Sequence, residues 1–439
     1  MRPGRAATGA GDLSGQRDLS RYWWGQTTSA FGSVFTAIAL PIVAVVYLGA
    51  SPGQLGLVSA ASVLPMFLFG LPAGALADRI ARPRRTLIAL DTLSALAIGV
   101  VALGVAGHVA SIGWLVSLAA VEGCATILFE VVYFIHLRQL VDVAGIGRVR
   151  ARLQAGQYAA GFIGRLLAGP AIVMLGPATA LCVDVVSYVL SAAALLSMSP
   201  VAPIPRNSPG ESATAGTGLR ATIGTGLRFF VGDAFHRALL VFLLAPAIVT
   251  AAVGTLTAPF LLRVVRVPTE AYGVLFAVSG LLGLAGSVLA GRLLGAGRDP
   301  RRITLAAVTA GVLGAVLLPL ANGPLALAAT CAALGIGLPT LFGAIANAAL
   351  SPMIVADVAA DAMGRTVAML QVFGAAAGLL GALAGGALGD WLGVRPAIWV
   401  LSAGALAAVV LALPPAVRAA RQPGDAAASG AADLAQATG

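Results

Sequence analysis

The sequence predicts an all-α membrane protein of about twelve transmembrane helices, and its composition and charge pattern carry that prediction. Hydrophobic residues make up 59% of the 439 residues and charged residues only 10%, whereas an ordinary soluble domain carries about 25% charged residues. Long apolar stretches are almost free of charge, and the basic residues gather between them. A soluble chain of this length would expose too much apolar surface, so lipid is the expected solvent for most of it.

The charge-free stretches set the expected crossings in order. No charge occurs between Arg21 and Asp78, and this stretch is interrupted only by the turn at 49–53. One crossing takes about 20 residues, so the stretch predicts a helical hairpin. The same reasoning predicts a second hairpin over 302–357, with its turn at 321–324, and single helices over 86–106, 112–137, 153–175, 178–198, 238–262, 271–291, 366–389 and 396–417.

The arginines predict how these helices are oriented. All 27 basic residues are arginine. With the N-terminus placed in the cytoplasm, the outer loops hold only Arg263, Arg266 and Arg395, and Arg165 lies within a helix. Every other arginine falls on the inner side, as the positive-inside rule requires. We therefore expect both termini in the cytoplasm.

The basic balance, a net charge of +10, excludes some function classes. A nucleic-acid-binding protein gathers its basic residues on one soluble face, whereas these lie in short loops, so no nucleic-acid partner is expected. A phosphate-binding P-loop needs a lysine, and the chain has none, which argues against an ATP-driven pump. No cofactor or metal site is expected, because the cysteines and histidines are scattered, namely Cys124, Cys182, Cys331, His108, His136 and His236.

The chain also repeats itself. Residues 21–199 and 236–415 are similar in length, and each is expected to hold six helices. The loop motif at 168–178 recurs at 384–397, where each copy ends in Leu-Gly and a proline. The sequence thus predicts a tail at 1–20, a six-helix bundle at 21–199, a linker with an interfacial helix at 200–235, a second bundle at 236–415 and a tail at 416–439. Two parallel six-helix repeats are typical of one large class of secondary transporters.

The loop between the second and third helices carries the most specific motif. It reads Gly-Ala-Leu-Ala-Asp-Arg-Ile-Ala-Arg-Pro-Arg-Arg over 74–85 and resembles the signature loop of the major facilitator superfamily. The resemblance implies that Gly74 allows close helix approach. It also implies that Asp78, Arg79, Arg82 and Arg85 form a charged gating loop on the cytoplasmic side. The chain departs from the pattern at 81 and 83, where alanine replaces the second glycine and proline interrupts the basic run.

Further stretches narrow the resemblance. Residues 164–169, 175–177 and 184–187 are similar to the fifth and sixth helices of the branch that contains macrolide-efflux and enterobactin-exporter proteins. Residues 129–133 are similar to a stretch of the fourth helix in the macrolide-efflux type. Arg165 stands where that branch usually has proline. The resemblance implies export of a small molecule by alternating access. We expect the chain to lie in the bacterial cytoplasmic membrane.

Four charged residues are expected inside the membrane, where a charge costs about 2.5–3.5 kcal/mol and is usually paired or functional. They are Glu122, Glu130, Arg165 and Asp184. Glu122 and Arg165 fall near the middle of consecutive helices, so we expect them to pair. Asp91 is closer to the edge, and a peripheral salt bridge with Arg85 is expected there.

Glu130 is the favoured proton-coupling or cation-selecting group, because the resemblance implies that the fourth helix lines the central cavity. The alternative is a structural carboxylate bonded to Tyr133 or to a neighbouring hydroxyl. Glu122 and Asp184 are the other candidate proton-coupling or substrate-binding groups, together with Tyr133 and Arg165.

The leading functional hypothesis is a proton-driven antiporter that exports a lipophilic drug or metabolite. The expected partners are a small-molecule substrate, protons and membrane lipids, and the expected state is a monomer. An importer of a nutrient or siderophore on the same fold is the alternative. A membrane enzyme or lipid scramblase is less favoured, because the sequence shows no clustered His/Asp or metal-ligand constellation of the kind such an enzyme needs.

Overall fold

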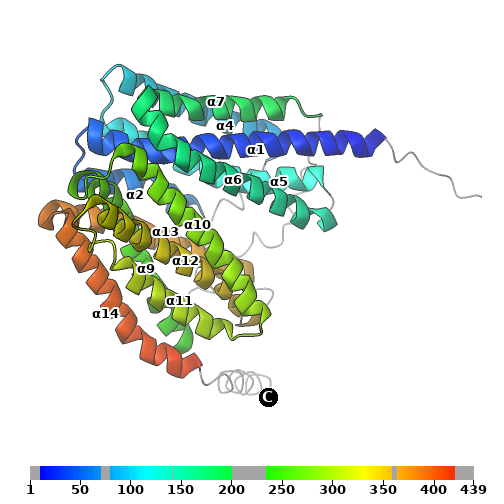
Figure 1. The fold of residues 1–439 in the computed structure, drawn as a ribbon. Coiled ribbons are helices and arrows are strands. Elements are labelled where there is room, and N and C mark those ends of the chain that lie inside the picture. Colours follow the sequence, from blue (N-terminus) through cyan, green and yellow to red (C-terminus); the bar gives the residue numbers. More distant parts are fainter. Residues whose placement is uncertain (1–9, 71–79, 142, 200–233, 358–362, 421–439) are drawn as a thin grey trace, which may run out of the picture. The chain divides into compact units, whose positions relative to one another are not determined.

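The computed structural model describes residues 10–70, 80–141, 143–199, 234–357 and 363–420 (Figure 1). Every regular element in these residues is helical. The first half contains α1 (Ala10–Ile42), η1 (Val43–Tyr47), α2 (Pro52–Phe69), α4 (Pro83–Ala106), α5 (Ile112–Leu140), α6 (Val143–Leu175) and α7 (Pro177–Leu196). The second half contains α9 (Ala234–Pro259), η2 (Phe260–Val264), α10 (Thr269–Gly295), α11 (Pro300–Ala315), α12 (Leu325–Asp357), α13 (Met363–Leu392) and α14 (Val394–Ala420).

The prediction of about twelve transmembrane helices is confirmed. Twelve α-helices lie in the described residues, and eleven of them are long and apolar enough to cross a membrane. The twelfth, α11, has only 16 residues. Its backbone continues to Ala321 through turns closed by hydrogen bonds between residues three apart, as from Leu318 N to Ala315 O at 3.1 Å. The shortfall at α11 is therefore a tightening of its last turns.

The chain folds into two compact units. Unit 1 comprises the described residues within 1–50, 61–215 and 268–274, and unit 2 those within 51–60, 216–267 and 275–439. Each unit thus contains most of one sequence repeat. The first turns of α2 belong to unit 2 and the first turns of α10 to unit 1, which exchanges two short segments relative to the repeat.

The duplication is visible in the backbone where the first helix of each half ends. Both helices widen into a π-helical turn, η1 in the first half and η2 in the second. The residue that follows by the same interval is left-handed in both, Gly49 with φ of +65° and Arg266 with φ of +60°. The closing hydrogen bonds match in pairs: Leu48 N to Val43 O and Val265 N to Phe260 O are both 2.9 Å, and Ala50 N to Ala44 O and Val267 N to Leu261 O are both 2.8 Å.

The repeated Leu-Gly loop motif has the same backbone conformation in both copies. Gly176 and Gly393 both have φ of +85°, and each is followed at once by a helix, α7 or α14. A left-handed residue at a helix junction favours glycine, which has no Cβ to clash. The predicted duplication of a six-helix unit is therefore confirmed in conformation as well as in sequence.

Within unit 1, α7 is central. It packs against both α1 and α4, while α6 lies against α1 and α5 lies against α4 (Figure 1). Helix α1 approaches α7 closely because Gly32 has no side chain: a Cβ at Gly32 would overlap the side chain of Ser187. This close approach brings the polar residues of α1 and α7 together.

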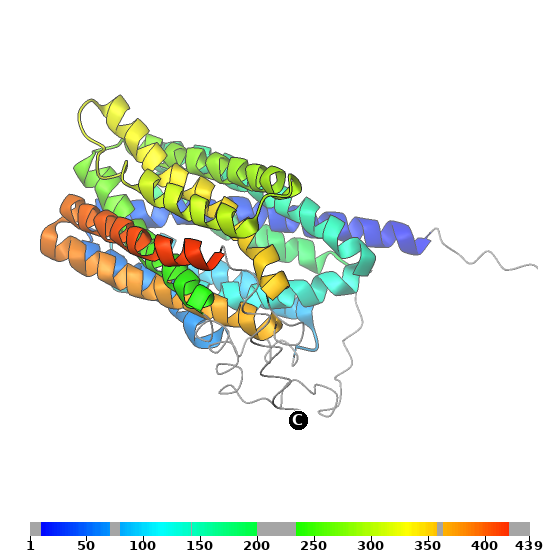
Figure 2. The same ribbon diagram turned by 90° about the horizontal axis from the view of Figure 1, so that it is seen from below.

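Within unit 2, α9 packs against α13 and α14, and α11 packs against α12 (Figure 2). The four-residue spacing of glycines along α13 predicts close helix contact. That prediction is confirmed at Gly381, Gly385 and Gly389, where an added Cβ would meet Ile248, Ala252 or Leu256 of α9. Gly374 has no such neighbour, because it faces a cavity.

Candidate functional site

Among the described residues of the membrane-spanning helices, the most deeply buried carboxylate is that of Asp184 on α7, which is 1% exposed. Its oxygens accept hydrogen bonds from hydroxyl groups: Thr36 Oγ1 at 2.5 Å, Ser187 Oγ at 3.0 Å and Ser33 Oγ at 3.4 Å. No ion pair to Asp184 forms within the described parts of the chain. The side chain therefore relies on neutral donors, in surroundings where an isolated negative charge is costly.

Glu122 on α5 belongs to the same polar cluster. Its Oε2 accepts a hydrogen bond from the hydroxyl of Tyr188 at 3.4 Å, and Ser33 Oγ lies 3.3 Å from that hydroxyl. Ser33 and Tyr188 thus link the carboxylates of Asp184 and Glu122 across α1, α5 and α7. Glu122 Oε1 is buried and has no hydrogen-bond partner in the described residues. We call Ser33, Thr36, Glu122, Asp184, Ser187 and Tyr188 the carboxylate cluster.

The expected Glu122–Arg165 pair is wrong. Glu122 contacts Tyr188 of α7, and no carboxylate of a described residue lies within ion-pair distance of Arg165. The reason is packing: α5 lies against α4, whereas α6 lies against α1. The consecutive helices α5 and α6 are therefore not each other's main packing partners. Arg165 is half-buried, and its carbonyl oxygen lies against Gly273, where a Cβ would collide with it.

The expected salt bridge between Asp91 and Arg85 is also wrong. Asp91 is 2% exposed and makes no ion pair with any described residue, while Arg85 is exposed. Six residues along a helix correspond to a rotation of about 240°, so the two side chains point to different faces of α4. Asp91 points into unit 1, and its Oδ2 is buried without a hydrogen-bond partner in the described residues.

Glu130, the favoured coupling group, has a different environment from the carboxylate cluster. Its side chain is exposed on α5, and none of the described residues forms a hydrogen bond or ion pair with it. Tyr133 stacks on aromatic neighbours instead of bonding Glu130: its ring centroid lies 5.9 Å from that of Tyr22 and 6.2 Å from that of Phe129. The role assigned to Glu130 stays a prediction.

Part of the expected gating loop lies outside the described residues, namely Gly74, Asp78 and Arg79. Arg82 and Arg85 are described and are both exposed at the start of α4. Neither makes an ion pair with a described carboxylate. The latch role of this loop therefore also stays a prediction.

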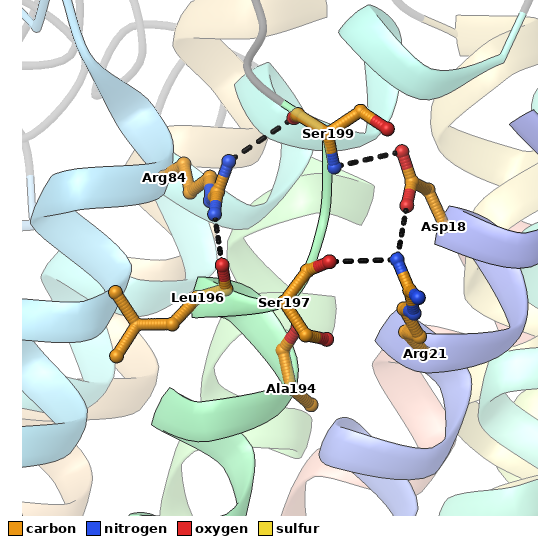
Figure 3. Close-up of polar contacts among 7 residues, drawn as sticks. All are labelled: Asp18, Arg21, Arg84, Ala194, Leu196, Ser197 and Ser199. Atoms are coloured by element: carbon orange, nitrogen blue, oxygen red, sulfur yellow. Dashed lines mark hydrogen bonds and ion pairs between the residues drawn. The ribbon is translucent and has the colours of Figure 1, made fainter. Parts of the chain in front are cut away.

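Sequence reasoning missed the contacts of Arg84, which lies between those two arginines. Its Nη2 donates to Leu196 O at 2.7 Å and its Nη1 to Ser199 O at 3.0 Å (Figure 3). Both acceptors lie at the C-terminal end of α7. A cation at a helix C-terminus is favourable because the last carbonyl groups are unsatisfied and carry partial negative charge.

Asp18 and Arg21 of α1 bind the same end of α7. Arg21 Nη1 donates to Ser197 O at 2.6 Å and pairs with Asp18 Oδ1 at 3.2 Å, and Ser199 N donates to Asp18 Oδ2 at 3.1 Å (Figure 3). The three-residue spacing of Asp18 and Arg21 was a signal for an ion pair on one helix face. Their contacts with Ser197 and Ser199, which follow the last residue of α7, were not readable from spacing.

Unit 2 contains a large cavity that the sequence did not reveal. Its volume is about 790 Å³, and it is lined by residues of α9, α11, α12, α13 and α14, with Phe276 from α10. None of the described residues that line it is charged. The lining polar side chains are those of Thr250, Thr257, Thr340, Asn347 and Ser402. These scattered hydroxyl and amide groups on otherwise apolar helices were the only available signal.

The fold and these two interiors define a multi-pass membrane protein built from two helical repeats, one with buried carboxylates and one with an apolar cavity. The family model described as the Major Facilitator Superfamily matches residues 22–353, so the chain belongs to that superfamily. The chain is accordingly a membrane transporter of a small molecule rather than an enzyme. No sequence among the curated proteins matches the chain.

Solved structures support the same fold. The chain is similar to the nucleoside transporter NupG, with a TM-score of 0.71 and 11% identity, over 91% of this chain and 98% of that one. It is similar to a bacterial homologue of the iron transporter ferroportin in an inward-facing state, with a TM-score of 0.68 and 14% identity, over 91% and 99%. A POT family transporter in complex with 5-aminolevulinic acid gives 0.69 and 11%, over 92% and 96%. At such identities the likeness concerns the fold alone.

Proposed function

We propose that this transporter is a proton-coupled antiporter that exports a lipophilic small molecule. The observation that carries the proposal is Asp184, a buried membrane carboxylate whose hydrogen bonds from the side chains of described residues all come from neutral hydroxyl groups. The narrower resemblance to macrolide-efflux and enterobactin-exporter proteins agrees with export. The carboxylate cluster would handle the proton, and the cavity of unit 2 would contribute the substrate site.

The argument for proton coupling begins with the cost of charge. An ionised carboxylate inside the membrane is expensive and is normally neutralised by a cation or by a proton. Within the described residues, Asp184 has no cation as a partner. Binding and releasing a proton is the remaining way to change its charge. Because Tyr188 and Ser33 connect Asp184 to Glu122, the two carboxylates are expected to act as one proton site.

The argument for a lipophilic substrate comes from the cavity lining. A volume of about 790 Å³ lies within the range of roughly 300–1,000 Å³ that drug-sized ligands occupy. A charged ligand would need an opposite charge or many hydrogen bonds to replace its water, and the lining offers no charge. A mostly apolar molecule with a few hydrogen-bonding groups fits this lining best.

The argument for export follows from the substrate class. A lipophilic molecule diffuses into a cell through the bilayer without a transporter. Moving it back out against its concentration gradient requires energy, which a proton gradient can supply. Uptake of a polar nutrient or siderophore is the alternative, and it would call for a more polar cavity than this one.

The experiment measures accumulation of lipophilic cations, macrolides and dyes in energised, efflux-deficient bacteria that express the chain. We expect the chain to lower accumulation, and a protonophore or Asp184→Asn to restore it. Asp299→Asn is the matched control: Asp299 accepts a hydrogen bond from Arg301 N at 2.9 Å as the N-cap of α11, and asparagine caps equally well.

Two outcomes contradict parts of the proposal. Full proton-driven efflux by Asp184→Asn would show that Asp184 is not the coupling group. Glu130 would then be the favoured coupling residue, and Glu130→Gln would test it. Unchanged accumulation of every probe, together with proton-driven uptake of a labelled nutrient or siderophore, would replace export by import.

A further inference from the structure

Unit 1 contains a second set of buried polar side chains that the carboxylate cluster does not use. They are Tyr22 of α1, Asp91 of α4, His136 of α5 and Ser191 of α7, and their exposed fractions are 1%, 2%, 0% and 0%. The hydroxyl of Tyr22, Oδ2 of Asp91, both ring nitrogens of His136 and Oγ of Ser191 have no well-formed hydrogen bond to a described residue. The nearest polar neighbours are Ser191 for Asp91 and Gln139 for His136. We call these four residues the inner polar group.

The four side chains converge although they come from four helices. The ring of His136 meets that of Tyr22 edge-on, with 5.4 Å between centroids. Ser191 lies beside Asp91, and Asp91 is near enough to Tyr22 to act on it electrostatically. They are therefore neighbours whose polar atoms are not paired by well-formed direct hydrogen bonds.

The inner polar group continues the carboxylate cluster along α7. Asp184, Ser187, Tyr188 and Ser191 are spaced three or four residues apart, so they lie on one face of the helix. Asp184, Ser187 and Ser191 are all buried. The face of α7 that carries Asp184 thus extends toward Ser197, the C-cap residue that Arg21 binds.

Helix α4 makes the same connection from the other side. Ser94 lies one turn from Asp91 and is also 2% exposed. It faces both Glu122 and Tyr188. A continuous line of polar side chains therefore runs through unit 1 from Asp184, by way of Tyr188, Ser94 and Asp91, to His136 and Tyr22.

Few charged side chains of the described residues surround the inner polar group. Among the groups that face it, Arg84 of α4 acts on His136, and Arg150 of α6 acts on Tyr133, which stacks on Tyr22. On α1 the next charged residues are Asp18 and Arg21, which bind the end of α7. No described cation forms an ion pair with Asp91.

Leaving these polar atoms unpaired would be costly. A buried donor or acceptor without a partner costs about 1–3 kcal/mol, and this group contains five such atoms. Buried waters typically satisfy groups of this kind, with about three hydrogen bonds each. Gaps between polar side chains on four helices offer such a water several partners.

We propose that the inner polar group holds internal water and conducts protons between the carboxylate cluster and the end of unit 1 that the arginine distribution predicts to be cytoplasmic. The direction in which protons move rests on the proposed function. The presence of internal water does not depend on that function. At each step one O–H or N–H bond breaks and the next one forms, so one proton moves and no group is consumed. Asp91 and His136 are the two titratable relays, and Tyr22 and Ser191 orient the water.

The first test asks whether water is present, independently of transport. X-ray radiolysis generates hydroxyl radicals from bound water, and mass spectrometry locates the labelled side chains. In the purified chain we expect labelling of Tyr22 and His136 despite their burial, and its loss in Asp91→Leu, which fills the site with an apolar side chain. Absence of label at both residues in the unaltered chain would overturn the proposal, whatever the transported substrate.

The second test separates proton movement from substrate movement in proteoliposomes. For Asp91→Asn and His136→Gln we expect transport driven by a pH gradient to slow about tenfold, which corresponds to about 1.4 kcal/mol in the barrier. Substrate exchange at equal pH on both sides should be unchanged, because it needs no net proton movement. Asp299→Asn serves as the control, and thermal unfolding checks that each variant is folded.

The outcomes are distinguishable. Unchanged pH-driven transport in both variants overturns the relay. Equal slowing of pH-driven transport and of exchange also overturns it, because the defect would then be structural. If the unaltered chain shows exchange but no response to a pH gradient, the proposed proton coupling fails, and the labelling test alone decides whether the water is there.

Discussion

The two units share a backbone plan but differ in the chemistry of their interiors. Unit 1 buries the carboxylates of Asp91 and Asp184 and part of Glu122, all on membrane-spanning helices. In unit 2 the described interior holds an apolar cavity of about 790 Å³ without a charged lining residue. The π-helical turns and left-handed residues nevertheless recur at matching positions. Duplication therefore preserved the backbone geometry, while the side chains that line the two interiors diverged.

The largest expected effect tests whether transport needs the carboxylates of unit 1. Asp184→Asn keeps the size of the side chain but removes its ability to exchange a proton. Because positioned proton-transfer groups typically contribute about 10²–10⁴-fold, we expect pH-driven transport to fall at least about a hundredfold, with exchange retained. Proteoliposome flux measured with and without a pH gradient checks this. A loss of both activities would mean that Asp184 holds the fold or the substrate instead.

Helix packing in the two halves is compared by adding one methyl group to each. At Gly385 an added Cβ would collide with the backbone oxygen of Ala252, whereas at Gly32 it would meet the side chain of Ser187. Overpacking typically costs about 1–3 kcal/mol, and backbone yields less than a side chain. We expect Gly385→Ala to lower the unfolding temperature more than Gly32→Ala, measured by thermal unfolding in detergent. The reverse order would mean that the α1–α7 contact is the more rigid one.

The cavity of unit 2 is tested by filling it. A Cβ at Gly343 meets no atom within 4 Å, and Gly343 lines the cavity. Gly343→Leu is therefore expected to weaken substrate binding about tenfold, or about 1.4 kcal/mol, through lost volume. Gly404→Leu is the matched control, because Gly404 is equally exposed and has the same free space around it but does not line the cavity. Equal binding by both variants would move the substrate site away from this cavity.

The smallest expected effect concerns the left-handed residue that follows each π-helical turn. Gly49 and Arg266 occupy matching positions with nearly the same φ, but only glycine adopts this conformation without steric cost, which for other residues is about 1–2 kcal/mol. We expect Arg266→Gly to stabilise the protein by about 1 kcal/mol and Gly49→Ala to destabilise it by a similar amount. Denaturation of purified protein measures both. Destabilisation by Arg266→Gly would show that the arginine makes a contact that outweighs the strain.

The helices and their duplication were predictable because their signals are local. A charge-free apolar run of about 20 residues specifies a membrane helix on its own, so the spans agree with the structure even where the ends differ. The Leu-Gly loop motif likewise revealed the repeat, since glycine is needed where φ is positive. At α11, by contrast, the tightening into turns near Ala315 left no mark in the apolar pattern.

The two predicted salt bridges are wrong because a salt bridge depends on how each helix is rotated about its axis and on which helix lies beside it. Glu122 was expected beside Arg165 because their helices are consecutive, yet α5 packs against α4 and α6 against α1. Asp91 was expected beside Arg85, but six residues turn a helix by about 240°. The roles of Glu130, of Tyr133 and of the loop at 74–85 remain predictions.

The sequence by itself determined the solvent, the number of crossings and the duplicated plan, because hydropathy adds up residue by residue along the chain. Only the tertiary structure decided that Asp184 and Glu122 meet through Tyr188, that Asp91 points inward and that the described residues lining the cavity of unit 2 carry no charge. Each of these depends on how far a helix is rotated about its axis and which helix lies beside it. Those choices are set by packing contacts between distant residues, such as Gly32 with Ser187, which no local pattern records.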